Sequence, residues 1–234
     1  MKFREKKALV FGGTSGIGAA TSQLLDEAGA RVVAVSRNPD RAGHMPANVV
    51  LEKCDVLDET ALEQLFSAHA PFDILVSTAT GGERELGPFA SMTMAGFRGS
   101  FDKLFGYANV VRHGLRHLAA DGNIVLVSGS PARRCRPGQI ALSSVGGAVE
   151  AFVRGLAPEI APRRINVVSP GVIDTPMQSA TGKEREELYA NMTQNHLIPR
   201  AGTSREVAEA ILFLAGNAFV TGTTIDVDGG WLLT

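Results

Sequence analysis

The sequence predicts an α/β fold, a single-domain doubly wound parallel β-sheet with helices on both faces. Short apolar, β-branched runs recur along the chain, amphipathic helical stretches separate them, and a glycine-rich turn follows the first run. Strands this apolar must be covered on both faces, which is typical of parallel sheets. No Pro/Ser-rich linker or internal repeat divides the 234 residues, so one domain spanning residues 1–234 is expected.

Seven apolar runs are expected to form the strands of this sheet. In chain order they are Ala8–Phe11, Arg31–Val35, Val49–Glu52, Ile74–Val76, Ile124–Val127, Ile165–Val168 and Thr224–Val227. The first β–α–β unit is the clearest: Ala19–Ala28 repeats apolar residues at helical spacing, and Gly29 ends that helix before the second strand. Short right-handed crossovers between successive strands then give the doubly wound arrangement.

Composition excludes several classes of function. A formal net charge of −1 without a Lys/Arg block argues against nucleic-acid binding and against a polybasic membrane anchor. Cys54 and Cys135 lack CxxC spacing, so the sequence suggests neither a disulfide framework nor a zinc site. The start MKFREKKALVF has too short an apolar run for a signal peptide, and no run is long enough to span a bilayer. We expect a soluble cytoplasmic protein with no metal.

A glycine-rich turn, FGGTSGIG at residues 11–18, lies between the first strand and the first helix. Glycines at 12, 16 and 18 permit a tight turn and close approach to a pyrophosphate, whose charge the helix N-terminus stabilises. The GxxxGxG spacing resembles the short-chain dehydrogenase/reductase family, and the resemblance covers almost the whole chain. It implies a Rossmann-type fold and a nicotinamide cofactor, whereas the alternative is a glycine turn without a ligand. The implied contacts are Gly12, Thr14, Ser15, Gly16, Ile17 and Gly18.

The end of the second predicted strand indicates which cofactor would bind. An NAD-specific enzyme presents Asp or Glu there to the ribose 2′-hydroxyl, but this chain has Ser36 and Arg37. Arg37 is placed to meet a 2′-phosphate, which favours NADP(H) over NAD(H), although a solvated arginine is the alternative.

Three further segments resemble cofactor-binding motifs of the family. Asp55 and Val56 stand where the family contacts adenine, although a turn or N-cap role for Asp55 is the alternative. The segment DILVSTATG stands where the family has DxLVNNAG, so hydroxyls of Ser77, Thr78 and Thr80 must remake the usual hydrogen bonds. The PGxxxT-like segment after the sixth strand would hold the nicotinamide and the phosphates. The positions carried over from these last two motifs are Ser77, Ala79, Pro170, Gly171, Ile173 and Thr175.

The segment IVLVSGSPARRCRPGQIALSSVGGA, residues 124–148, resembles the catalytic stretch of the family. In the family a Ser is followed about thirteen residues later by Tyr and four further on by Lys. In this register the Tyr position is Leu142, which cannot transfer a proton, and the Lys position is Gly146, which carries no charge. The Ser position falls on Gly129, so Ser128 and Ser130 on either side are the candidates to polarise a substrate oxygen.

Two basic residues are candidates to supply the positive charge that this segment lacks. Aligned through Gly106, the family's Asn in the preceding helix falls on Lys103. Since that Asn neighbours the family's Lys, Lys103 could fill the volume left by Gly146 and place a cation near the ribose. A surface lysine is the alternative. On the loop PARRCRP, Arg133 and Arg134 are expected to contact the substrate pocket better than Arg136, and Arg133 would stabilise negative charge unless the loop is merely solvated.

The polar segment 177–200 lies after a strand end, where ligand clefts form in such sheets. It is interpreted as a mobile lid, with a plain surface excursion as the alternative. Tyr189 and His196 lie in it and could supply an acid when the lid closes, although residues of a lid are usually exposed and we expect the same of these two. Tyr107, one helical turn after Lys103, is expected in the core or an interface.

These features predict an NADPH-dependent reductase with an atypical active site, acting on a C=N, activated C=C or C=O bond of a small organic substrate. The alternative is a non-redox NADP(H)-binding protein, either a sensor or a catalyst by pocket shape. The resemblance implies a homodimer or homotetramer, and the small residues Gly146, Gly147, Ala148 and Ala151 would permit close helix packing.

Overall fold

A computed structural model describes residues 3–82 and 84–234, and residues 1, 2 and 83 lie outside the description. Its main sheet has seven strands, all parallel, in the order β3-β2-β1-β4-β5-β6-β9. The strands are β1 (Lys7–Phe11), β2 (Arg31–Ser36), β3 (Val50–Lys53), β4 (Phe72–Ser77), β5 (Leu118–Val127), β6 (Arg164–Pro170) and β9 (Thr224–Val227). The winding reverses between β1 and β4, the switch point where doubly wound sheets bind ligands. The predicted fold class and all seven predicted strands are confirmed.

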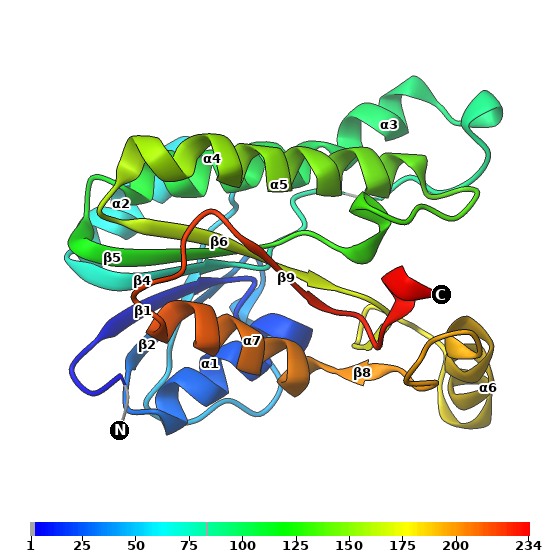
Figure 1. The fold of residues 1–234 in the computed structure, drawn as a ribbon. Helices are drawn as coiled ribbons and strands as arrows, with labels where there is room; N and C mark the ends of the chain where they lie inside the picture. Colours follow the sequence, from blue (N-terminus) through cyan, green and yellow to red (C-terminus); the bar gives the residue numbers. More distant parts are fainter. Residues whose placement is uncertain (1–2, 83) are drawn as a thin grey trace.

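Helices cover both faces of the sheet (Figure 1). One face carries α1 (Gly16–Glu27) and α7 (Ser204–Gly216), and the other carries α2 (Glu59–His69), α4 (Asp102–Gly114) and α5 (Ile140–Ile160). Alternate strand residues serve the two cores, since Leu9 packs on the side of α2, α4 and α5 whereas Val10 packs on the side of α1 and α7. This two-sided burial is why the strands are apolar throughout.

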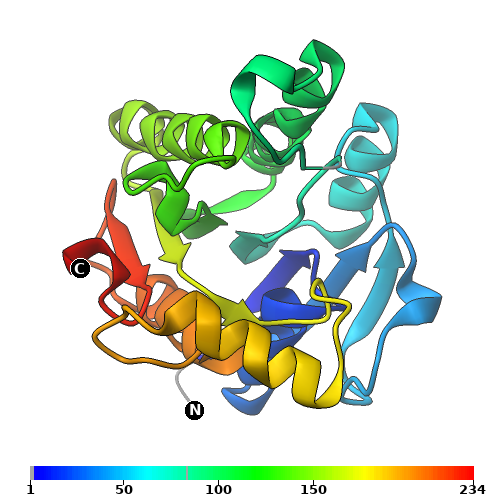
Figure 2. The same cartoon turned by 90° about the vertical axis from the view of Figure 1, so that its right-hand side faces the viewer.

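Segments beyond the carboxyl ends of the strands surround the candidate functional site (Figure 2). There α3 (Met94–Ser100) and α6 (Gly182–Thr193) lie on opposite sides of the sheet edge. A two-stranded parallel sheet, β7 (Ile173–Asp174) with β8 (Gly202–Thr203), brackets α6, and the sequence did not predict it. Short 3₁₀ helices occur at Pro39–Arg41, Phe89–Ser91, Ser130–Ala132 and Trp231–Leu233.

By length and composition alone, α5 is apolar enough to cross a membrane. In the fold, however, its residues Val149, Val153 and Ile160 belong to the core on the side of α2 and α4. Its apolar character is therefore that of a core helix packed on the sheet.

Candidate functional site

A cavity of about 970 Å³ opens at the carboxyl ends of the central strands. Its volume is at the upper end of the range typical of small-molecule sites. It brings together residues from the glycine turn, the ends of β2, β4, β5 and β6, and α4. The predicted cofactor residues that line it are Gly12, Ser15, Gly16, Ile17, Gly18, Ser36, Arg37, Val56, Ala79, Lys103, Pro170, Gly171, Ile173 and Thr175.

Three predicted cofactor residues, Thr14, Asp55 and Ser77, are not among the residues that line this cavity. The Asp55 Oδ1 accepts a hydrogen bond from the Leu57 amide at 3.0 Å, so this carboxylate closes a turn, and its contact with adenine stays a prediction. Ser77 is fully buried at the end of β4. The next residue, Thr78, lines the cavity instead and donates from Oγ1 to the Phe11 carbonyl at 3.1 Å.

The glycine turn fits a bound pyrophosphate. Gly12 has φ +74°, and a Cβ built on it would lie 2.5 Å from Thr78 Oγ1. A Cβ on Gly18 would lie 2.0 Å from the Gly12 carbonyl oxygen, so neither position accepts a side chain. Ser15, the N-cap of α1, makes no side-chain capping bond, which leaves the first amides of that helix available to an anion.

The end of the cavity beside β2 offers hydrogen-bond capacity that the described residues do not use. The buried Ser36 Oγ has no hydrogen-bond partner among the described residues. Arg37 follows directly and lines the same cavity. A hydroxyl and a guanidinium side by side fit a 2′-phosphate.

Lys103 lies in the first turn of α4, and its Nζ donates to the Ser128 carbonyl at 2.9 Å. Surrounding protein desolvates this ammonium and Arg84 repels it, so the pKa of Lys103 falls to about 7. A smaller cavity of about 60 Å³, large enough for a water molecule, is lined by Lys103, Arg84, Leu142 and Gly146, among others. Lys103 and Gly146 therefore face the same space, although the role of Lys103 stays a prediction.

The position of Gly146 is closed to a side chain. A Cβ built there would lie 2.9 Å from the Ala132 Cβ, closer than such atoms approach one another. The 3₁₀ turn before α5 thus packs directly on the helix backbone. A cation facing this space must come from another element, and α4 supplies one.

The loop before α5 differs from expectation. Arg133 forms an ion pair with Asp226 of β9, with Nη1 at 3.0 Å from Oδ2, and its Nε lies 3.6 Å from Glu150. Arg134 stacks on the Trp231 ring at 3.9 Å. Neither is among the residues lining the cavity, whereas Arg136 is, so the expectation about which arginines contact the pocket was wrong. The carboxylates of Asp226 and Glu150 hold the Arg133 guanidinium, and the Trp231 carbonyl and the Thr234 hydroxyl hold that of Arg134.

Of the two candidate serines, both line the main cavity. The Ser128 Oγ donates to the buried Glu150 Oε1 at 3.0 Å, which commits that hydroxyl to α5. Ser130 is buried in the turn that follows β5. Ser130 is therefore the freer of the two for contact with a ligand.

Several cavity residues were missed or misjudged in the sequence. Arg84 lines both cavities, and its place shortly after β4 was the signal that could have identified it. Tyr189 and His196 are only 9% and 7% exposed and line the main cavity, so the expectation of exposure was wrong. Tyr107 is buried in the core as expected, donating to the Val127 carbonyl at 3.1 Å.

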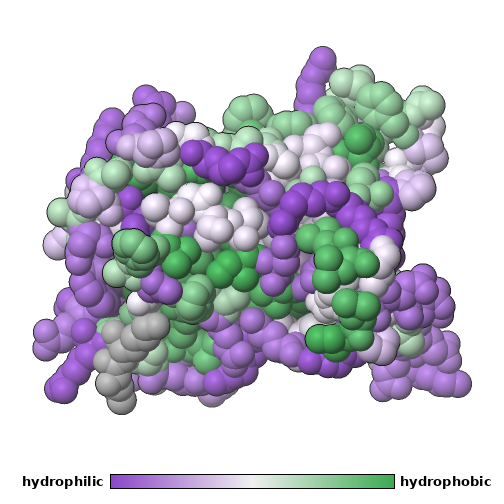
Figure 3. Space-filling model, in the orientation of Figure 1, coloured by the Kyte–Doolittle hydropathy of each residue, from purple (hydrophilic) through white to green (hydrophobic). Residues whose placement is uncertain are grey.

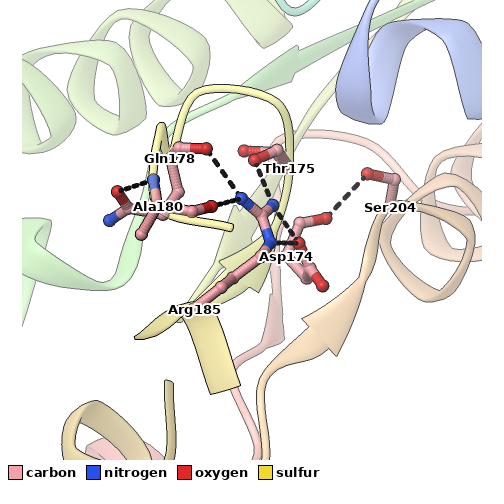
Figure 4. A network of polar contacts seen from close by, with 6 residues as sticks. All are labelled: Asp174, Thr175, Gln178, Ala180, Arg185 and Ser204. Carbon is pink, nitrogen blue, oxygen red and sulfur yellow. Dashed lines mark hydrogen bonds and ion pairs between the residues drawn. The ribbon is translucent and has the colours of Figure 1, made fainter. Parts of the chain in front are cut away.

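Segment 177–200 is held at its start by Arg185 of α6 (Figure 4). Its guanidinium donates to the carbonyls of Thr175 at 2.8 Å, Gln178 at 2.7 Å and Ala180 at 3.0 Å. It also pairs with the Asp174 carboxylate of β7. One side chain thus links α6 to the strand and turn that carry Thr175. Because a Cβ on Gly16 would lie 3.5 Å from the Thr175 Cβ, this turn also borders the glycine turn.

Comparison with known proteins places this fold and site in a family. Residues 12–232 match the family described as "Enoyl-(Acyl carrier protein) reductase". L-xylulose reductase of Bos taurus is 32% identical over 245 residues, covering 100% of this chain and 99% of that protein.

Two solved structures are similar over nearly their whole length. A small-chain dehydrogenase in complex with NADPH matches with a TM-score of 0.83 and 28% identity, covering 98% of this chain and 100% of that one. The ligand-free aldohexose dehydrogenase of Thermoplasma acidophilum matches with a TM-score of 0.89 and 28% identity, covering 99% and 96%. Together with the parallel sheet and the glycine turn, these matches show that the chain belongs to the short-chain dehydrogenase/reductase family of oxidoreductases.

Proposed function

We propose that this protein is an NADPH-dependent reductase of the family that works without a tyrosine at the usual position and uses Lys103 in its place. The observation that carries the proposal is the continuous cavity that runs from Arg37 past the glycine turn to Lys103 and Leu142. The bond reduced is a C=N, an activated C=C or a C=O of a small organic substrate.

Binding of the cofactor rests on residues along one side of the cavity. Gly12, Gly16 and Gly18 would receive the pyrophosphate, while Ser36 and Arg37 would receive the 2′-phosphate. When bound, NADPH supplies a hydride. The NADPH in a solved relative supports the choice of cofactor.

The proton needed for reduction comes from Lys103 in this proposal. With a pKa of about 7, its Nζ is present in both protonation states near neutral pH. It delivers one proton to the oxygen, nitrogen or carbon being reduced and is then reprotonated by water in the adjoining small cavity. An iminium substrate needs no proton, so Lys103 would matter least for that class.

The surroundings of Lys103 support such a role. Leu142 presents an apolar wall, which lowers the local polarity and strengthens interactions with charge. Arg84 adds a permanent positive charge that stabilises a developing oxyanion. Ser130 offers a hydroxyl to the same oxygen.

The cofactor preference tests the first half of the proposal. Fluorescence titration should show that NADPH binds at least about tenfold more tightly than NADH, because the 2′-phosphate gains charge-assisted hydrogen bonds. Arg37→Asp should reverse this preference while thermal unfolding stays unchanged. Equal affinity for both cofactors in the native chain would contradict the assignment.

The redox role is tested by mixing the NADPH complex with panels of imines, enones and ketones and following absorbance at the reduced nicotinamide band. Oxidation of NADPH by at least one panel is expected, and Lys103→Met should slow ketone reduction more than iminium reduction. A bound cofactor that no panel consumes would instead favour a non-redox NADP(H)-binding protein.

A further inference from the structure

One wall of the cavity comes from residues outside the predicted cofactor-binding motifs. This recognition wall consists of Arg136 from the loop before α5, Tyr189 from α6, His196 from the turn after α6, and Trp231 from the last 3₁₀ helix. All four line the main cavity, although they lie far apart in the sequence.

Arg136 is held rigidly in this wall. Its guanidinium lies over the Trp231 ring at 4.0 Å, and its Nη2 donates to the Met192 carbonyl at 3.1 Å. The His196 ring lies 5.1 Å from the same indole. Among the described residues Arg136 has no carboxylate partner within ion-pair distance, so most of its N–H groups stay available.

Two further polar atoms in the wall lack partners. The Tyr189 hydroxyl and the His196 Nε2 are buried and make no hydrogen bond with any described residue. Buried polar groups are nearly always hydrogen-bonded, since leaving one unpaired costs free energy. Lining the same cavity as Arg136, these groups are suited to a ligand that accepts several hydrogen bonds.

The charge of the residues that line the cavity indicates which class of ligand binds there. The described residues that line the cavity include Arg37, Arg84, Lys103 and Arg136 but no Asp or Glu. Such a site attracts anions, and a fixed guanidinium fork matches the two oxygens of a carboxylate. Leu86, Met177 and Met192 give the same space an apolar lining, which suits a hydrocarbon body.

We propose that the substrate is an organic acid whose carboxylate binds Arg136, with Tyr189 and His196 donating further hydrogen bonds, while its reducible bond lies toward Lys103. This inference rests on the proposed function and adds the substrate class to it. The carboxylate anchors one end of the molecule, so that binding energy far from the reacting bond orients that bond.

Matched acids and esters test this inference. Calorimetric titration of the NADP⁺ complex uses aromatic and aliphatic 2-, 3- and 4-oxo acids, their methyl esters, and phosphate monoesters of similar size. We expect the tightest acid to bind at least about tenfold more tightly than its ester and than any phosphate monoester. NADP⁺ in place of NADPH allows binding to be measured without turnover.

Variants then locate the anchor. Arg136→Gln should abolish the preference for acids over esters while leaving the NADP⁺ affinity unchanged, and Arg136→Lys should retain part of it because the charge remains. Tyr189→Phe should weaken acid binding several-fold. Arg98→Gln, an exposed arginine of α3 that does not line the cavity, is the matched control. Thermal unfolding of each variant checks that the fold persists.

The possible outcomes separate this inference from the proposed function. If no acid binds, if esters or phosphate monoesters bind as tightly as acids, or if Arg136→Gln leaves the preference intact, the carboxylate anchor is wrong. NADPH consumption by neutral substrates in the redox panels would then leave the reductase proposal standing. Acids that bind through Arg136 without ever being reduced would instead support the anchor and contradict the reductase.

Discussion

At the residue scale, burial of the Lys103 ammonium lowers the stability of the fold and brings its pKa into the range useful for proton transfer. Placing an ammonium among protein atoms and near Arg84 disfavours its charged form. Neighbouring groups do not remove this cost, since the Ser128 carbonyl accepts one hydrogen bond and the Tyr107 hydroxyl is committed to Val127. Burial also raises the pKa of Tyr107, which therefore stays neutral and offers no compensating charge. A residue kept at such cost is a candidate for function.

This cost predicts how stability depends on pH. The pKa of Lys103 is about 7 in the folded protein and 10.5 for a solvated lysine, so between these limits the unfolded chain binds the additional proton. Its contribution to the free energy of unfolding therefore rises with pH across this range, by up to about 1.4 kcal/mol per unit. Below pH 7 the penalty is fully present.

Lys103→Met removes that penalty. Urea unfolding should show the variant to be more stable than the native chain, most clearly near pH 6, with a difference that shrinks toward pH 10. Lys53→Met, at an exposed position of β3, should show no such trend. A difference between Lys103→Met and the native chain that is constant with pH would mean that Lys103 keeps an ordinary pKa.

At the element scale, α6 joins the cavity to the rest of the fold through few contacts. It contributes Tyr189 and Met192 to the cavity, and much of the rest of the helix is exposed. Arg185 connects it to β7 and the turn that follows (Figure 4). Because the predicted lid function requires a segment that opens more easily than the core, this connection is where its opening would be controlled.

Arg185→Ala should therefore loosen residues 177–200 selectively. Hydrogen–deuterium exchange of these residues should become about tenfold faster, since several charge-assisted bonds are lost together, while exchange in the strands stays unchanged. Lys183→Ala is the matched control, because Lys183 makes only a surface pair with Glu187 at 3.4 Å. Equal exchange in the two variants would show that α6 is held by other contacts.

At the scale of the whole molecule, the face formed by α5, β9 and α7 shows apolar surface (Figure 3). β9 is an edge strand of the main sheet, and the segments before and after it in the chain carry the exposed side chains of Phe213, Phe219 and Leu233. Phe219 is 101% exposed. Large apolar side chains gathered beside a sheet edge are typical of an interface between copies. We propose a homodimer or homotetramer that uses this face.

Analytical ultracentrifugation tests this arrangement. The native chain should sediment as a dimer or tetramer at micromolar concentration, and Phe219→Asp should shift it toward the monomer without changing its NADPH affinity. Phe89→Asp, at an exposed phenylalanine in the 3₁₀ helix Phe89–Ser91, serves as the comparison. A native monomer, or an equal effect of both substitutions, would argue against this interface.

Local sequence patterns predicted most of the architecture because strand burial and helical spacing repeat over a few residues. The largest error in a strand boundary was in β5, which begins at Leu118 rather than near Ile124. There Leu118 pairs with Phe72, and residues 119–122 lie in the irregularity between that pair and the pair of Ile74 with Asn123. Asp55 likewise stands at the expected position, but a local turn engages its carboxylate.

By itself the sequence determined the parallel sheet, the glycine turn and the cationic end of β2, because each follows from the conformational needs of neighbouring residues. Only the tertiary structure decided which side chains meet across the cavity. Lys103 of α4 and Gly146 of α5 line the same small cavity, and Arg136 at the main cavity lies over the ring of Trp231, 95 positions later. Such contacts depend on how distant elements pack, and packing distances leave no repeating pattern in the sequence.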